Sequence, residues 1–156
     1  MGSTGGTLAG IARRAAPRAP MEVLDAADLS VEAGVGGDFR GRLKPGARNR
    51  RQVSLIERSD WDAATAEIGA ALPWQTRRAN LLVEGLDLPQ QGGARLRIGA
   101  TALVEITVEC DPCFRMEQIA PGLEAALTPD WRGGALARVL EGGRIAVGDT
   151  IRIEEA

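Results

Sequence analysis

The chain is 156 residues long, which is enough for one domain with a buried core. Its 44% hydrophobic and 26% charged residues are typical of a soluble globular protein, and its formal net charge of -2 gives no overall attraction to polyanions. The absence of histidine excludes a Ser-His-Asp triad, a Cys-His pair and a histidine-ligated zinc site. Aromatic residues make up only 3% of the chain, so a nucleic-acid interface built on base stacking is not expected.

The sequence also indicates where the protein works. No apolar run approaches the roughly 20 residues of a membrane-spanning helix. Two cysteines are too few for a disulfide scaffold, which favours a reducing, cytoplasmic location. We therefore expect neither a nucleic-acid partner nor a membrane. We expect a flexible tail over residues 1–7 and a single domain over residues 8–156, because no repeat or low-complexity linker divides the chain.

The first third of the chain has a β-rich pattern with one basic segment. The 20 glycines fall between short apolar runs, as they do in folds made of short strands. Asp38 follows two glycines and would be a turn residue or a helix cap. The segment 39–51 contains no acidic residue and six basic ones: Arg40, Arg42, Lys44, Arg48, Arg50 and Arg51. Such a segment is either a flexible surface loop or a docking site for an acidic partner.

A strand followed by a helix is predicted next. Polar and apolar residues alternate over 52–55, as they do in a half-buried strand. Ser59 would cap the helix, with Asp62 at the capping-box position. An apolar face runs from Trp61 to Leu72, and Pro73 would end the helix.

Three polar residues then precede the apolar stretch 81–83. They are Arg77, Arg78 and Asn80. Guanidinium groups match phosphate or carboxylate, and an asparagine amide offers both donors and an acceptor. At the mouth of a barrel these side chains would hold an anionic ligand rich in hydrogen-bonding groups. The alternative is a solvated turn.

The second half of the chain predicts hairpins and short helices. Residues 95–98 alternate, Gly99-Ala100 would form a two-residue loop, and a strand would follow up to residue 109. Short helices are expected after Cys113 and over residues 123–127, while residues 135–140 fit either a strand or a helix. Glycine-containing turns at 141–143 and 148–149 would bound the last strands.

The two cysteines differ in their expected positions. Cys110 is in register with Val104, Ile106 and Val108, so it should face the core as a small, inert side chain. Cys113 follows Pro112, which ends strand pairing, so its thiol should lie on a turn. One C-x-x-C without other ligands does not make a structural zinc site. Cys113 is therefore either the reactive residue of the protein or an incidental turn cysteine.

Seven short segments carry a family resemblance. They are Gly34–Asp38, Arg51–Ile56, Arg78–Asn80, Val83–Gly85, Gly93–Gly99, Asp111–Cys113 and Gly143–Asp149. In this order and spacing the chain resembles the MOSC domain, named for the C-terminal domain of molybdenum cofactor sulfurases. The resemblance extends from about Leu8 to the C-terminus. It implies a mainly β (α+β) fold, a barrel-like domain with a few peripheral helices.

The resemblance also implies roles for individual residues. Cys113 would be the catalytic cysteine, which either carries sulfur as a persulfide or ligates molybdenum. Arg78 and Asn80 would help to hold the molybdopterin of the molybdenum cofactor. Further cofactor-binding candidates lie in matching or adjacent positions: Arg77, Arg51 and Asp38.

Three functions remain open at this stage. The protein would bind molybdenum cofactor and reduce N-oxygenated compounds with electrons from a separate partner, or carry sulfur received from a cysteine desulfurase. The third is a non-catalytic barrel whose basic loop docks an acidic partner. Eukaryotic sulfurases place a pyridoxal-phosphate domain before the MOSC domain, and we expect none in this chain, whose only lysine is Lys44. A stand-alone domain would bind the cofactor weakly, as a dimer, or not at all.

Overall fold

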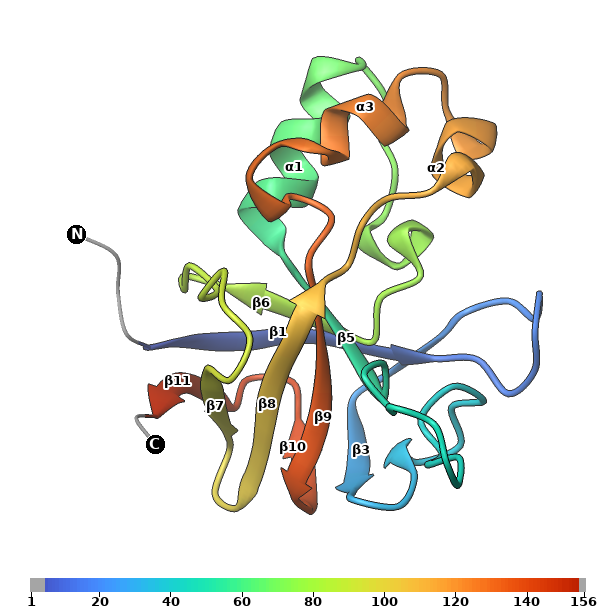
Figure 1. The fold of residues 1–156 in the computed structure, drawn as a ribbon. Helices are drawn as coiled ribbons and strands as arrows, with labels where there is room; N and C mark the ends of the chain where they lie inside the picture. The colour runs from blue at the N-terminus through green and yellow to red at the C-terminus, as the bar shows by residue number, and fades with distance from the viewer. Residues whose placement is uncertain (1–4, 155–156) are drawn as a thin grey trace.

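A closed β-barrel forms the body of the protein, and three short helices gather at one end of it (Figure 1). The computed structural model describes residues 5–154. The barrel strands run in the order β11-β7-β8-β9-β5-β6-β1, and pairing of β1 with β11 closes the ring. Their bounds are β1 Gly5–Arg13, β5 Val53–Glu57, β6 Leu81–Glu84, β7 Arg95–Ile98, β8 Ala102–Glu109, β9 Ala135–Glu141 and β11 Thr150–Glu154. The mainly β, barrel-like fold expected from the sequence is confirmed.

Shorter elements decorate this barrel. Strand β2 (Glu22–Leu24) pairs with β1, and a separate sheet has the order β10-β3-β4. The bounds of that sheet are β3 Ala26–Ser30, β4 Gly34–Val35 and β10 Gly143–Ala146. The helices are α1 Arg58–Glu67, α2 Phe114–Ile119 and α3 Leu123–Leu127, with 3-10 turns η1 Trp74–Arg77 and η2 Pro129–Trp131.

One parallel pair interrupts the antiparallel barrel. Strands β5 and β6 run in the same direction, so the chain must cross over between them, and α1 and η1 form that crossover. This places the segment before β6 beside the start of β5. The register pairs Leu55 with Leu81 and Ile56 with Leu82. Because successive strand residues face opposite sides, Leu55 packs inside the barrel and Ile56 packs outside against the helices.

The structure corrects the expected boundaries of the first helix. Glu57 occupies the N-cap position of α1, and no side chain caps the helix, so the capping role predicted for Ser59 is wrong. The helix ends at Glu67, because Gly69 has a φ of 66° and turns the chain before Pro73 is reached. Trp61 is nevertheless buried as expected, and its indole nitrogen donates to the Leu72 carbonyl at 2.9 Å.

One turn also differs from expectation. Ile98 pairs with Ala102, so three residues rather than two connect β7 to β8. The glycine-containing segment 141–143 separates two strands as expected, and it leads from β9 of the barrel to β10 of the smaller sheet. The stretch 135–140, which fitted either element, is part of strand β9.

The N-terminal segment is more ordered than expected. Residues 1–4 of the expected tail lie outside the described residues, but residues 5–7 pair with β11 and so belong to the barrel. Within residues 5–154, no helix has the length and apolar character needed to cross a membrane.

Candidate functional site

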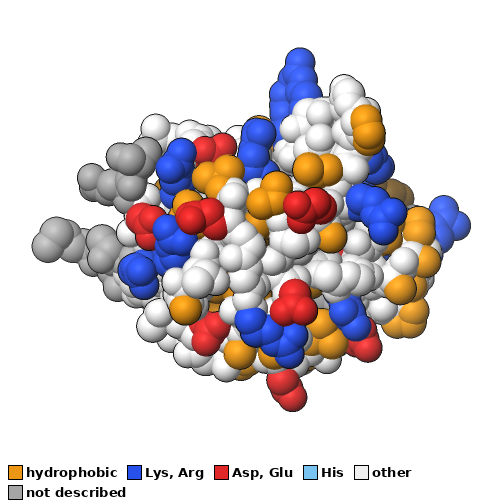
Figure 2. Space-filling model, turned by 90° about the horizontal axis from the view of Figure 1, so that it is seen from below, with side chains coloured by type: hydrophobic (Ala, Val, Ile, Leu, Met, Phe, Trp, Pro, Cys, Tyr) orange, Lys and Arg blue, Asp and Glu red, His pale blue; other side chains and the backbone are white. Residues whose placement is uncertain are grey.

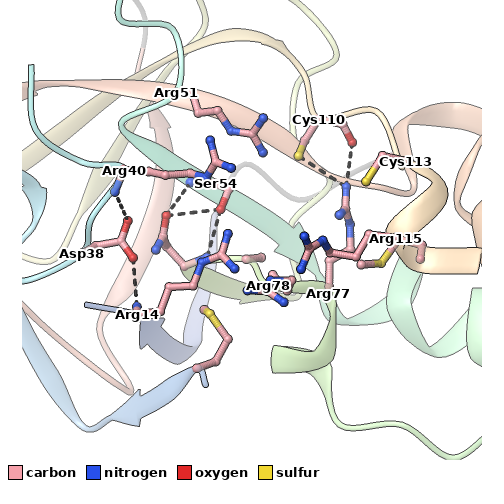
Figure 3. Close-up of a pocket in the computed structure, with 14 residues that line it drawn as sticks. Arg14, Asp38, Arg40, Arg51, Ser54, Arg77, Arg78, Cys110, Cys113 and Arg115 are labelled. Atoms are coloured by element: carbon pink, nitrogen blue, oxygen red, sulfur yellow. Dashed lines mark hydrogen bonds between the residues drawn. The ribbon is translucent and has the colours of Figure 1, made fainter. Parts of the chain in front are cut away.

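A cavity of about 150 Å³ opens beside the starts of the parallel strands β5 and β6 (Figure 3). It collects residues from segments that are distant in the sequence: the end of β1, the loop before residue 41, the start of β5, the turn before β6, the end of β8 and the start of α2. All six site residues expected from the sequence line it: Asp38, Arg51, Arg77, Arg78, Asn80 and Cys113. Six arginines and one acidic residue face this cavity, so it is strongly positive.

Cys113 is exposed and Cys110 is buried, as expected, but Cys110 lines the cavity and its sulfur accepts a hydrogen bond from Arg77, so it is not the inert core residue expected from the sequence. Cys110 is 6% exposed at the end of β8, and its backbone N–H donates to the carbonyl of Gly134 at 2.9 Å. Cys113 is exposed and occupies the N-cap position of α2 with extended backbone angles. Both line the cavity, but only the Cys113 thiol is accessible to a reagent or ligand.

Arg77 supports the cavity wall from within. It is 7% exposed, and its Nε donates to the Gly133 carbonyl at 3.0 Å. Its Nη2 donates to the carbonyl oxygen of Cys110 at 3.0 Å and to the Cys110 sulfur at 3.3 Å. These contacts tie η1 to the end of β8 and to the turn before β9. Two of its three nitrogens therefore already have protein partners.

Arg78 is different, although it is the next residue. It has a φ of 70°, a left-handed conformation, at the C-cap position where η1 ends. Its Nε and Nη2 are buried without a hydrogen-bond partner among the described residues. Burial lowers the pKa of Arg78, the positive charge of Arg115 lowers it further, and the thiolate charge of Cys113 opposes both. Buried guanidinium nitrogens without acceptors are costly, and an anion in the cavity would satisfy them.

The side chain of Asn80 is hydrogen-bonded to strands of the barrel. Its Oδ1 accepts from the backbone N–H of Ser54 at 3.0 Å and from the Ser54 hydroxyl at 3.2 Å. Its Nδ2 donates to the Ala12 carbonyl at 3.1 Å. The amide thus joins β1, β5 and the start of β6, and it fixes the conformation that presents Arg78. This framework role was not expected from the sequence.

Asp38 organises the opposite wall. Its two carboxylate oxygens accept from the backbone N–H groups of Arg14 at 3.0 Å and Arg40 at 3.3 Å. Burial raises the pKa of Asp38, while hydrogen bonds from Arg40 and Asn80 oppose the rise. The guanidinium groups of Arg14 and Arg40 lie 4.8 and 5.0 Å from the ring centroid of Phe39. Asp38 therefore holds two cationic side chains at the cavity, and its role as a turn residue is confirmed.

Several lining residues were not identified as site residues from the sequence. They are Arg14, Met21, Arg40, Ser54, Ala79, Arg115 and Met116. Arg115 is the one with a local signal, because it lies two residues after Cys113 in the short helix predicted to follow that residue. Arg14 reaches the site only because β1 pairs with β6, which no local pattern indicates.

Comparison with known proteins assigns the chain to a family. Residues 38–152 match the MOSC domain. Because the match covers more than half of the chain, the protein belongs to the MOSC domain family, which is associated in general with the molybdenum cofactor. Among curated proteins, a search finds no match.

Solved structures share the fold. The YuaD protein from Bacillus subtilis is similar with a TM-score of 0.80, 21% identity and coverage of 97% of both chains. YiiM from Escherichia coli is similar with a TM-score of 0.67, 16% identity and coverage of 96% of this chain and 70% of that chain. YiiM from Geobacillus stearothermophilus is similar with a TM-score of 0.65, 16% identity and coverage of 96% of this chain and 73% of that chain. At these identities the likeness establishes the common barrel.

Proposed function

We propose that this protein binds molybdenum cofactor in the arginine-lined cavity, with Cys113 as the reactive thiolate beside it. One observation carries the proposal: Arg78 presents buried, unpartnered nitrogens to the same cavity that Cys113 lines. The unpartnered Arg78 nitrogens would be satisfied by an anion, and the Cys113 sulfur is a soft metal ligand or a nucleophile. Family membership supports the choice of cofactor.

The chemistry of the lining residues fits the proposed cofactor. Molybdopterin carries a phosphate group, which a guanidinium fork binds through two parallel hydrogen bonds. Arg78, Arg40, Arg51 and Arg115 have no ion pair among the described residues and are free to make such bonds. A bound molybdenum ion would supply redox chemistry, and Cys113 would be a protein ligand for it.

Different residues of the cavity would bind the ligand and position the residues that bind it. Arg78 and Arg115 lie close enough to affect each other's charge, and Arg78 also feels the charge of Cys113. They would therefore hold the anionic part of the ligand near the sulfur. Arg77 and Asn80, whose donors bond to the protein, would keep the turn before β6 rigid and so position Arg78. In a reductase of N-oxygenated compounds, electrons would come from a separate protein.

Sulfur transfer is the second candidate, and the exposure of Cys113 favours it. The Cys113 thiolate would attack the terminal sulfur of a persulfide on a cysteine desulfurase. The new S–S bond forms on Cys113, the donor's S–S bond breaks, and the donor cysteine leaves as a thiolate. This step needs no metal and no added oxidant. Cys110, which is buried, would not take part.

The decisive experiment for cofactor binding measures the metal bound to four proteins. Wild type, Cys113→Ser, Arg78→Met and Arg48→Glu are purified from cells that make molybdenum cofactor, and bound molybdenum is measured by mass spectrometry. Cofactor binding predicts metal in wild type and Arg48→Glu, and strong loss in the other two. Equal molybdenum in all four proteins, or none in any, would exclude the ligand role of Cys113.

The sulfur-carrier function has its own measurement. Each protein is incubated with a cysteine desulfurase and free cysteine, and its intact mass is recorded. A gain of one sulfur atom in wild type and Cys110→Ala, but not in Cys113→Ser, supports a carrier. If Cys113→Ser gains the same mass, another residue carries the sulfur and this function is abandoned.

A further inference from the structure

A second cavity, of about 220 Å³, lies beside the first one. We call it the basic groove; it is lined by Phe39, Arg40, Arg42, Lys44, Ala47, Asn49, Arg50, Arg51 and Gln52. Arg40 and Arg51 line both cavities, so the groove continues the cofactor cavity. Five of its nine lining residues are cationic and none is acidic. A ligand that enters one cavity therefore meets a second positive surface next to it.

The loop that forms the groove is tied down at its base. Gln52 is 3% exposed, and its Nε2 donates to the carbonyls of Val31 at 2.7 Å and Gly41 at 3.1 Å. Its Oε1 accepts from the backbone N–H of Val139 on β9 at 2.9 Å. The loop expected from the sequence as a flexible segment is thus anchored to the barrel. Ordering that precedes binding lowers the entropic cost of holding a ligand.

The tip of the loop is ordered as well. The Asn49 side chain accepts from the backbone N–H of Lys44 at 2.8 Å and donates to the carbonyls of Lys44 at 3.1 Å and Ala47 at 3.0 Å. Near the other end, the Thr107 hydroxyl donates to the Arg50 carbonyl at 2.6 Å. The groove is therefore a formed concave surface whose basic side chains project from a fixed backbone.

The cationic side chains at the two cavities also have no carboxylate partner within ion-pair distance, whereas most arginines elsewhere in the described residues have one. Seven arginines have a carboxylate within 3.8 Å: Arg13, Arg58, Arg95, Arg97, Arg132, Arg138 and Arg144. Among the described residues, no cation that lines the cavity or the groove has such a partner: Arg14, Arg40, Arg42, Lys44, Arg50, Arg51, Arg77, Arg78 and Arg115. Outside these two sites, Arg18, Arg48 and Arg152 are the cations without a carboxylate partner within residues 5–154.

This segregation is unusual for a chain with a formal charge of -2. On the face seen in Figure 2, acidic and basic side chains are interspersed. At the two cavities like charges instead face one another: burial lowers the pKa of Arg40, and the neighbouring Arg51 lowers it further. A bound anion would relieve this repulsion at the point where the two cavities join.

We propose that the basic groove is a second anion subsite that binds a diphosphate group, either free or carried by a nucleotide. Arginine forks match phosphate oxygens, and five cationic side chains around one groove offer enough donors for a ligand with more than one phosphate. The cavity's concave shape and small volume favour a small molecule over an acidic protein segment. The proposal rests on the proposed function only in assigning the first cavity to the cofactor; diphosphate binding in the groove is independent of molybdenum.

Charge reversals within the loop test the subsite. Inorganic pyrophosphate and orthophosphate are titrated by calorimetry at low ionic strength into wild type, Arg42→Glu, Arg50→Glu and Arg48→Glu. All three variants change the net charge equally, but Arg48 lines neither cavity. Pyrophosphate should bind wild type more tightly than orthophosphate does. Arg42→Glu and Arg50→Glu should each weaken it by about tenfold, and Arg48→Glu by less than about threefold.

Each alternative outcome has a definite meaning. An equal loss of pyrophosphate affinity in all three variants would indicate that the overall positive charge of the loop attracts the anion, and it would overturn the subsite. Binding of a hexaglutamate peptide with no measurable pyrophosphate binding would also overturn it, in favour of an acidic protein partner. Adenosine diphosphate that binds more tightly than pyrophosphate would support the subsite with a nucleotide as its source, and equal affinities would support free diphosphate. A protein that binds pyrophosphate in the groove but no molybdenum would contradict the proposed function and support the subsite.

Discussion

The guanidinium of Arg77 donates from one nitrogen, Nη2, to both the backbone oxygen and the sulfur of Cys110, at 3.0 and 3.3 Å. The same side chain bonds to the turn before β9 through Gly133. A Cβ at Gly133 would lie 2.6 Å from the Cys110 oxygen, so the three segments meet with no spare room. Arg77 therefore holds the segments of the cavity wall together, whereas two nitrogens of its neighbour Arg78 lack a hydrogen-bond partner in the described part of the chain.

Replacing Arg77 should therefore act on stability. Arg77→Ala leaves buried acceptors unpaired, and we expect the free energy of unfolding to fall by about 3 kcal/mol. Arg77→Lys keeps the charge but cannot reproduce the planar fork, so it should recover only part of the loss. Urea unfolding followed by tryptophan fluorescence measures both. A stability equal to wild type for Arg77→Ala would contradict the framework role.

Replacing Arg78 should have the opposite effect on the ligand-free protein. Arg78→Met removes a charge whose buried nitrogens have no acceptor, so we expect the free energy of unfolding to rise by about 1 kcal/mol. Arg78→Lys, which keeps the charge, should give no such gain. Thermal unfolding in phosphate-free buffer compares the three proteins. In phosphate buffer wild type should gain stability and Arg78→Met should not, since only wild type binds the anion there.

Local sequence patterns predicted much of the fold, for physical reasons that particular elements illustrate. Alternation identified β5, β7 and β8 because each has one face in the core and one toward another environment. The start of α1 was misplaced because the helix continues directly from β5 and needs no capping side chain. The β9 stretch was ambiguous because apolar residues lie on both of its faces and Arg138 is the one charged residue among residues 135–140, so the run has no clear period.

The candidate site was only partly predictable. Family motifs marked Arg78, Asn80 and Cys113, and these three line one cavity. The motifs could not show that Arg78 presents unbonded nitrogens to the cavity while Asn80 bonds to the barrel strands, since both residues belong to a single motif. That difference depends on a positive φ at Arg78 and on where Ser54 lies. Pairing of β1 with β6 brings in Arg14, and long-range strand pairing of this kind has no local signal.

A carboxyl pair on the crossover should make stability depend on pH. Burial raises the pKa of Glu57 from 4.5 to about 7, and the charges of Asp60 and Asp87 contribute to the rise. Burial also raises the pKa of Asp60, against the attraction of Arg132 and together with repulsion by Asp87 and Asp130. Between pH 4.5 and 7 the folded protein keeps a proton that the unfolded chain has released. The free energy of unfolding should therefore fall as pH rises through this window.

Glu57→Gln tests this dependence. The amide can still accept the hydrogen bond that the Leu88 backbone N–H donates to Glu57 at 3.1 Å, but it does not ionise. We expect the variant to be more stable than wild type at pH 8 by about 1 kcal/mol, since solvent screens a half-buried carboxyl, and equal to it near pH 4.5. Glu32→Gln, at an exposed position between β3 and β4, is the control. A wild-type slope that persists in Glu57→Gln would assign the effect to other groups.

The two thiols should react at very different rates, and an anion should slow the faster one. Cys113 is exposed and Cys110 is 6% exposed, so iodoacetamide should modify Cys113 faster by at least about tenfold, as peptide mass mapping would measure. Because Cys113 shares its cavity with Arg78, orthophosphate bound there should protect the thiol. Arg78→Met should abolish this protection, and Arg48→Glu should retain it. Protection that survives in Arg78→Met would place the anion elsewhere and would separate the reactive sulfur from the site proposed to hold the cofactor.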